Sequence, residues 1–160
     1  MASKKSSRKQ VQLQPRDYDL LDFLYCATSA TTMHICRASA AWRQPFASLD
    51  RTQRRLKALR RAGWVRRYPY RTASGLITGY YYKLTIAGYR ELVQDTHAQP
   101  PTQRFFAQMA EGNYRHDWYL TEVIVHTLLS AQRRSIRVAN FRPQGTAVIQ
   151  HGEELLRPDA

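Results

Sequence analysis

A chain of 160 residues with 43% hydrophobic side chains is long enough for one ordinary domain or two small ones. Its formal net charge of +13 favours an anionic partner, most often nucleic acid and less often a membrane surface. Against a membrane role, no apolar run approaches the roughly 18 residues of a spanning helix, and the opening MASKKSSRKQ lacks a signal-peptide core. Two cysteines, Cys26 and Cys36, are too few for a disulfide framework, which predicts a reduced, cytoplasmic protein.

Residues 1–14 are mainly Ser, Lys, Arg and Gln, a composition typical of a disordered basic arm. Part of this arm could be a plain solvated tail. Its cations would add non-specific attraction to DNA, and they are Lys4, Lys5, Arg8 and Lys9.

Two helices are predicted next. Pro15 and the acids after it are typical of a helix start, and an apolar face follows, made of Leu20, Leu21, Phe23, Leu24 and Cys26. A shorter helix over residues 30–40 would turn Met33, Ile35 and Cys36 inward, and Pro45 interrupts the pattern after it.

A third helix is expected to begin near Ser48 or Asp50 and to end at Gly63. Its buried stripe would hold Leu49, Thr52 or Gln53, Leu56 and Leu59. Strands are expected at 64–71 and 80–85 around a glycine-bounded loop, followed by a helix with Thr85 as its N-cap. Residues 15–95 therefore have the element order of a winged helix-turn-helix DNA-binding domain.

Positive charge gathers on the third predicted helix and the strand after it. Residues 49–71 hold eight arginines and one lysine, and no acid occurs between Asp50 and Glu91. A solvated helix face normally mixes both signs, because like charges one helical turn apart repel each other. A merely soluble arginine-rich face is the alternative, but the missing acids favour DNA.

The winged-helix reading assigns roles to these residues. The first two turns of the third helix would approach base edges through Arg51, Thr52, Arg54 and Arg55. Contacts with phosphate are expected from Lys57, Arg61, Arg66 and Arg67, and contacts from the wing from Arg71, Thr72, Ser74 and Thr78. An ordinary surface loop is nearly as good an explanation of the wing, and a tyrosine platform for single-stranded DNA at Tyr80–Tyr82 is less favoured.

Residues 96–160 are predicted to form a long helix and short strands. This part could be the start of a nuclease-like domain or of a dimerisation domain. The helix would be N-capped by Asn113 and carry an apolar stripe of Leu120, Val123, Ile124 and Leu128. Strands are expected at 135–141 and 146–150, and a third could begin within 151–160. A homodimer could form through Tyr119, Val123 and Ile124, or the same stripe could cover the strands.

Catalysis has little support in the sequence, so we expect no catalytic residue, cofactor or metal and no enzyme activity. His116, Asp117, Glu122 and His126 lie near one another, but no two histidines have the i,i+4 spacing of a helix-borne zinc site. Asp159 in a Pro-Asp pair could join Glu122 as half of a magnesium site, although two carboxylates do not complete one. The remainder would have to lie beyond Ala160.

Four stretches together resemble the replication-relaxation family of bacterial plasmids and mobile elements: PRDYDLLDFLYCATSATTMHIC, RTQRRLKALRRAGWVRR, GYYYKLTIAGYREL and LRPDA. The likeness covers about residues 13–160. Within it, Leu84, Thr85 and Gly88 form an LT-x-x-G pattern shared with many winged-helix regulators. The resemblance implies an N-terminal winged helix followed by a domain that opens with a helix and a Pro-Asp strand.

We therefore predict an α+β protein that binds double-stranded DNA in replication, transfer or maintenance of a plasmid or mobile element, with replication or transfer proteins as further partners. A winged-helix transcriptional repressor is one alternative. A truncated metal-dependent nuclease-like protein is another.

Overall fold

The computed structural model describes residues 11–95, 97–138, 149–151 and 154–156. In this part of the chain the fold is α+β, with six α-helices and two small antiparallel sheets of two strands each. None of these helices is both long and apolar enough to cross a bilayer.

Helix α1 (Pro15–Ala27) begins where the sequence predicts, with Pro15 in its first turn. Its buried side chains include Leu20, Leu21, Phe23 and Leu24, which are the centre of the hydrophobic core. Val11 and Leu13, which the sequence assigns to the arm, pack against this core. The four arm cations at positions 4, 5, 8 and 9 lie outside the described residues.

Helix α2 (Thr32–Ala38) presents a different face from the one predicted. Ile35 is buried as expected, but Met33 is 55% exposed and His34 takes the inward position. Thr31 caps the helix by accepting from the His34 backbone N–H, and the Thr31 N–H donates to His34 Nδ1 at 3.3 Å. Seven residues span two turns, so apolar periodicity alone does not fix the buried face.

Helix α3 (Leu49–Ala62) follows a short 3₁₀ turn, η1 (Ser39–Ala41), and a loop. Ser48 is the N-cap and accepts from the Arg51 N–H, while Gly63 ends the helix with a φ of +90°, as the sequence predicts. Thr52, Leu56 and Leu59 are buried. Leu49 departs from the predicted stripe and is 45% exposed.

Strands β1 (Val65–Arg71) and β2 (Ile77–Leu84) form the predicted hairpin, with β2 beginning three residues earlier than expected. The register pairs Val65 with Leu84 and shifts between Tyr70 and Arg71. On the other side of β2, Ala30 exchanges two backbone hydrogen bonds with Tyr82, at 3.1 and 2.8 Å. The segment between α1 and α2 therefore pairs with the free side of β2 through one residue, Ala30.

Helix α4 (Ile86–Val93) is fastened to the end of α3. The Thr85 hydroxyl accepts from the Gly88 N–H and lies 2.7 Å from the Gly63 carbonyl oxygen, to which it can donate. A Cβ at Gly88 would lie 2.2 Å from the Trp64 carbonyl oxygen, so only glycine fits there. The LT-x-x-G pattern thus builds a close joint between α3, β1 and α4.

The chain then passes through α5 (Gln103–Phe106) and the 3₁₀ turn η2 (Glu111–Asn113) to the long helix α6 (Tyr114–Arg133). Asn113 is the N-cap residue as predicted, although its side chain makes no capping hydrogen bond. Ile124 and Val125 are buried in the same core cluster as the α1 leucines, whereas Val123 is 59% exposed. The core therefore continues across the predicted domain boundary at residue 95.

After α6 the structure describes a second hairpin, β3 (Ile149–His151) paired with β4 (Glu154–Leu156). Strand β3 overlaps the end of the predicted strand 146–150, and β4 lies within 151–160, where a third strand was expected to begin. Residues 135–138 are not in a strand, which corrects that part of the expected 135–141 strand. The remainder of 135–148 and Asp159 lie outside the described residues.

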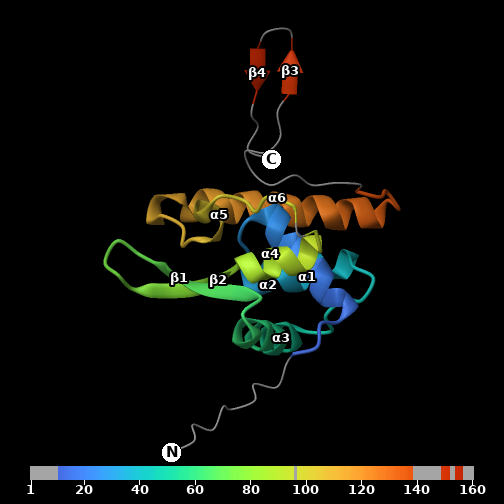
Figure 1. The fold of residues 1–160 in the computed structure, drawn as a ribbon, viewed down its shortest axis with the longest axis horizontal. Coiled ribbons are helices and arrows are strands. Elements are labelled where there is room, and N and C mark those ends of the chain that lie inside the picture. Colours follow the sequence, from blue (N-terminus) through green and yellow to red (C-terminus); the bar gives the residue numbers. More distant parts are fainter. Residues whose placement is uncertain (1–10, 96, 139–148, 152–153, 157–160) are drawn as a thin grey trace, which may run out of the picture.

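Figure 1 shows how these elements are arranged. Helix α3 lies along one edge and α6 along the opposite edge, with α1, α2 and α4 between them, and the tip of the β1–β2 hairpin points away from the helices. The outer side of α3 thus faces away from α6.

Candidate nucleic-acid interface

The outward face of α3 is cationic in the structure. Its exposed charged side chains, apart from Asp50 in the first turn, are Arg51, Arg54, Lys57, Arg60 and Arg61. Four of these were predicted as DNA contacts, and Arg60 was not singled out although it belongs to the same run. An exposed pair joins Arg54 to Asp50 at 2.8 Å, and at 79% and 63% exposure it holds Arg54 only weakly.

Two residues nominated to read bases do not project from α3, and both assignments are corrected. Thr52 is fully buried, and its hydroxyl donates to the Ser48 carbonyl at 2.9 Å. Arg55 turns toward α1, where its Nε donates to Asp17 Oδ1 at 2.8 Å and its second nitrogen also binds that carboxylate. Successive residues of an α-helix point about 100° apart, so Arg54 and Arg55 face different ways although they are adjacent in the arginine run.

The Asp17–Arg55 pair is a structural joint between α1 and α3. Asp17 is fully buried, and it also accepts from the Gln14 N–H at 2.6 Å as part of a capping box. Arg55 additionally donates to the Gln12 carbonyl at 2.8 Å. The acid that neutralises part of the arginine run therefore comes from 38 residues earlier in the chain, where the local sequence gives no sign of it.

The hairpin carries more of the predicted cations. Arg66 and Arg67 are exposed on β1, and the Arg67 guanidinium lies over the Tyr80 ring at 4.2 Å from its centroid. The guanidinium covers one face of the Tyr80 ring, and this stacking keeps Arg67 beside β2.

At the hairpin tip the predicted hydroxyls bond within the turn. The Thr72 hydroxyl lies 2.8 Å from that of Ser74 and accepts from the Leu76 N–H at 3.1 Å. Arg71 donates to the Gly75 carbonyl at 3.3 Å. Thr78 is exposed, and no hydrogen bond in the described residues holds its hydroxyl. Arg71 and Thr78 are thus the members of the predicted wing set with the most freedom to meet a ligand.

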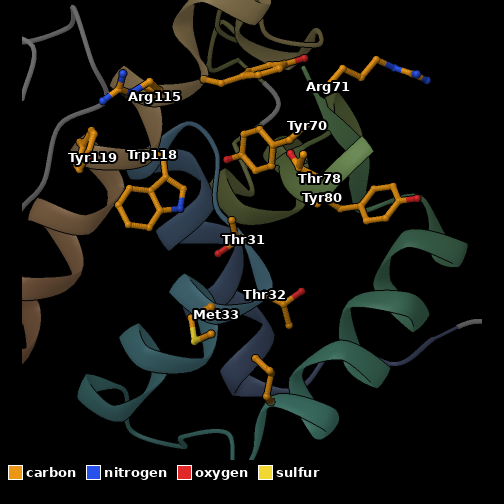
Figure 2. Close-up of a pocket in the computed structure, with 13 residues that line it drawn as sticks. Thr31, Thr32, Met33, Tyr70, Arg71, Thr78, Tyr80, Arg115, Trp118 and Tyr119 are labelled. Atoms are coloured by element: carbon orange, nitrogen blue, oxygen red, sulfur yellow. The ribbon is translucent and has the colours of Figure 1, made fainter. Parts of the chain in front are cut away.

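A groove of about 640 Å³ lies beside the hairpin, bounded by the starts of α2, α3 and α6. Figure 2 shows Thr31, Thr32 and Met33 between two aromatic side chains, Trp118 from α6 and Tyr80 from β2. Arg71 and Arg115 lie toward its outer edge in the same view. We call this hollow the hairpin groove; sequence reasoning did not find it, because its walls come from segments almost 90 residues apart.

Four tyrosines hold the hairpin and α6 together under this groove. The Tyr70 ring lies 4.8 Å from Tyr81 and 5.1 Å from Tyr114, centroid to centroid, and Tyr68 stacks on Tyr81 at 5.6 Å. Burial raises the pKa of Tyr70 to about 12, so it stays neutral at physiological pH. The Tyr81 hydroxyl accepts from the Met109 N–H at 2.9 Å. This packing fixes the start of α6 relative to the hairpin.

Glu122 of α6 has structural partners on α2. The Glu122 carboxylate accepts a hydrogen bond from Arg37 of α2 at 2.6 Å and lies 3.1 Å from His34 Nε2. These two contacts hold α6 to α2. Asp117 is half-buried, and burial raises its pKa, while His116 is exposed. Among the described residues no three His, Cys, Asp or Glu side chains gather closely enough to hold a metal ion.

Comparison with known proteins places the chain in a family. No curated protein and no solved structure matches the sequence. The replication-relaxation family matches residues 21–160, a range that includes α3, the β1–β2 hairpin, the hairpin groove and α6. The chain therefore belongs to the replication-relaxation family.

Proposed function

We propose that this chain is a double-stranded DNA-binding protein that acts in replication, transfer or maintenance of a plasmid or mobile element. The family supports the role in replication or transfer of such elements. The observation that carries DNA binding is the exposed cationic face of α3, where five basic side chains face solvent and Asp50 is the one acid in the helix. Each cation set against a phosphate releases a counterion and adds affinity.

The winged helix-turn-helix is part of the proposal. In that arrangement α3 enters the major groove, and the β1–β2 hairpin is the wing beside it. The three-helix order, the extra bridge from Ala30 to β2 and the position of the hairpin tip support it. Arg51 and Arg54, in the first two turns, would then reach base edges, and Lys57, Arg60, Arg61, Arg66 and Arg67 would meet phosphate.

The test measures binding to a short blunt duplex by fluorescence anisotropy at several salt concentrations from about 0.05 to 0.2 M. Replacing Lys57 and Arg61, the α3 cations assigned to phosphate, with alanine should weaken binding and reduce the slope of log K against log salt by about 2. Arg104 and Arg133, exposed on α5 and α6, are the matched pair: their double alanine variant has the same net charge and should keep the wild-type slope. Equal losses in both variants would show that binding follows net charge and not α3.

The repressor alternative differs in the DNA site, because both roles use the same surface. Selection of bound duplexes from a random pool separates them. An inverted repeat would favour a two-fold dimer on an operator, whereas tandem direct repeats would favour an origin-type site. A homodimer remains a prediction, with the exposed Tyr119 and Val123 of α6 as its candidate contacts.

A further inference from the structure

The hairpin groove is lined by exposed aromatic side chains, which binding of a DNA duplex through α3 does not require. Three large aromatic side chains at its rim stay substantially exposed: Tyr80 at 42%, Trp118 at 38% and Tyr119 at 56%. Two more apolar side chains of the lining, Met33 and Leu49, are also exposed, at 55% and 45%. Single exposed apolar residues are common, but a contiguous set around one hollow marks a contact surface.

The charge of the groove points to the chemistry of its occupant. Its lining residues include two arginines, Arg71 and Arg115, and no Asp or Glu. In the described structure neither guanidinium forms an ion pair, and Arg71 makes only its contact with the Gly75 carbonyl. Hydroxyl groups of Thr31, Thr32 and Thr78 add polar contacts between the aromatic walls. Anionic groups spaced along a chain with flat, apolar rings would satisfy both features.

Stacked duplex DNA does not expose base faces, so the aromatic walls would go unused against a blunt duplex. Unpaired bases do expose them, and stacking on aromatic side chains contributes about 1–3 kcal/mol per base with little dependence on sequence. The groove begins at the start of α3, from which Leu49 contributes to the lining, and runs to the start of α6. A strand that leaves a duplex held by α3 would meet the groove next.

We propose that the hairpin groove binds an unpaired DNA strand that continues from the duplex, with bases stacked on Trp118 and Tyr80 and phosphates bound by Arg71 and Arg115. The proposal rests on the proposed function for its placement beside a bound duplex. It adds a second substrate class, single-stranded DNA at a junction, to the duplex contacts of α3.

The experiment compares three probes for the full chain: a blunt duplex, the same duplex with a single-stranded extension, and the single strand alone. The variants are Trp118→Leu and Tyr80→Leu, which keep an apolar side chain and remove the ring. Ile86→Leu is the matched control, because Ile86 on α4 is 41% exposed, close to the exposure of Tyr80 and Trp118, and does not line the groove. Thermal unfolding of each variant checks its fold, and Tyr80→Leu serves if Trp118→Leu disturbs the ring contact with His34 at 5.3 Å.

Wild-type protein should bind the extended duplex roughly 5- to 150-fold more tightly than the blunt one, which corresponds to stacking of one base. Each ring variant should lose most of that gain and bind the blunt duplex as before, and Ile86→Leu should match wild type. Equal affinity of wild type for blunt and extended duplexes would overturn the groove proposal and leave the duplex function standing. Single-strand binding lost in the ring variants, with no blunt-duplex binding at all, would instead overturn the proposed function alone.

A second copy of the chain is the competing occupant, and the same variants test it. A ring variant that changes the molar mass in light scattering, with unchanged discrimination between the two duplexes, would assign the groove to self-association and overturn the proposal. An unchanged mass with lost discrimination supports it.

Discussion

Arg54 and Arg55 show how differently two adjacent identical residues can act. The Arg54 side chain is 79% exposed and meets only Asp50 at the surface, whereas the Arg55 side chain is 18% exposed and binds a fully buried carboxylate. The sequence predicts both as DNA contacts, because an arginine run does not reveal which member has a distant acidic partner. Asp17 lies in the first turn of α1, where an acid is expected for the helix start alone. The sequence therefore does not reveal that Asp17 also pairs with Arg55.

Alanine at Arg55 should therefore act on stability. Its loss leaves the Asp17 carboxylate buried beside an empty space, and breaking a buried pair in this way costs about 3–5 kcal/mol of the free energy of unfolding. Urea denaturation should show this loss for Arg55→Ala and a change under about 0.5 kcal/mol for Arg54→Ala. Similar midpoints for the two variants would contradict the joint between α1 and α3.

At the scale of elements, α6 is held to the helical body by polar contacts as well as by packing. Glu122 contacts Arg37 and His34 of α2, and the Thr121 hydroxyl donates a hydrogen bond to the Ser29 carbonyl oxygen at 2.9 Å. Helix caps, the glycine at the end of α3 and the hairpin were all predictable, because these signals are local. The face that α6 buries was predicted only in part, because its partners on α1 and α2 lie far away in sequence.

Stability should fall on acidification through His34. Burial lowers the pKa of His34 below its ordinary value of 6.5, against the opposing effect of Glu122. Below about pH 6.5 the unfolded chain then binds a proton that the folded chain takes up only at lower pH, so the free energy of unfolding drops as pH falls. The slope for one such group approaches about 1.4 kcal/mol per pH unit.

The measurement is urea unfolding at several values between pH 7 and pH 5. His34→Gln should flatten this part of the profile, whereas His126→Gln, which changes an exposed histidine 3.8 Å from the same carboxylate, should keep the wild-type slope. A His34→Gln profile parallel to wild type would assign the acid sensitivity to other groups.

For the whole molecule, the sequence predicts an α+β chain with a strong positive charge, and the structure agrees. It does not predict that the core continues past residue 95 to include Phe106 and the middle of α6. The polar stretch DTHAQPPTQ is typical of a linker, yet contacts on both sides of it, such as that of the Tyr68 hydroxyl with the Phe106 carbonyl at 3.0 Å, join the two parts. Composition describes a connecting segment and not what its ends pack against.

Deletion of residues 1–10 should weaken DNA binding by a similar factor for every sequence. The deleted segment contains four cations, Lys4, Lys5, Arg8 and Lys9, and their phosphate contacts carry no sequence information. Anisotropy titrations with a selected duplex and a scrambled one should shift together, with a shallower salt slope. The cut stops at residue 10 because Val11 and Gln12 are part of the folded structure. A loss confined to the selected duplex would contradict a non-specific role.

The hydrogen bond from Arg55 to the Gln12 carbonyl gives those first residues a fixed point of attachment beside α3. Ten residues extend at most about 35 Å, so their lysines are tethered within reach of any phosphate chain that α3 approaches. Cations joined in this way to the edge of α3 would raise the local concentration of positive charge at the proposed binding surface. A duplex caught first by this tether would be held next to α3 and could be tested for sequence there before it diffuses away.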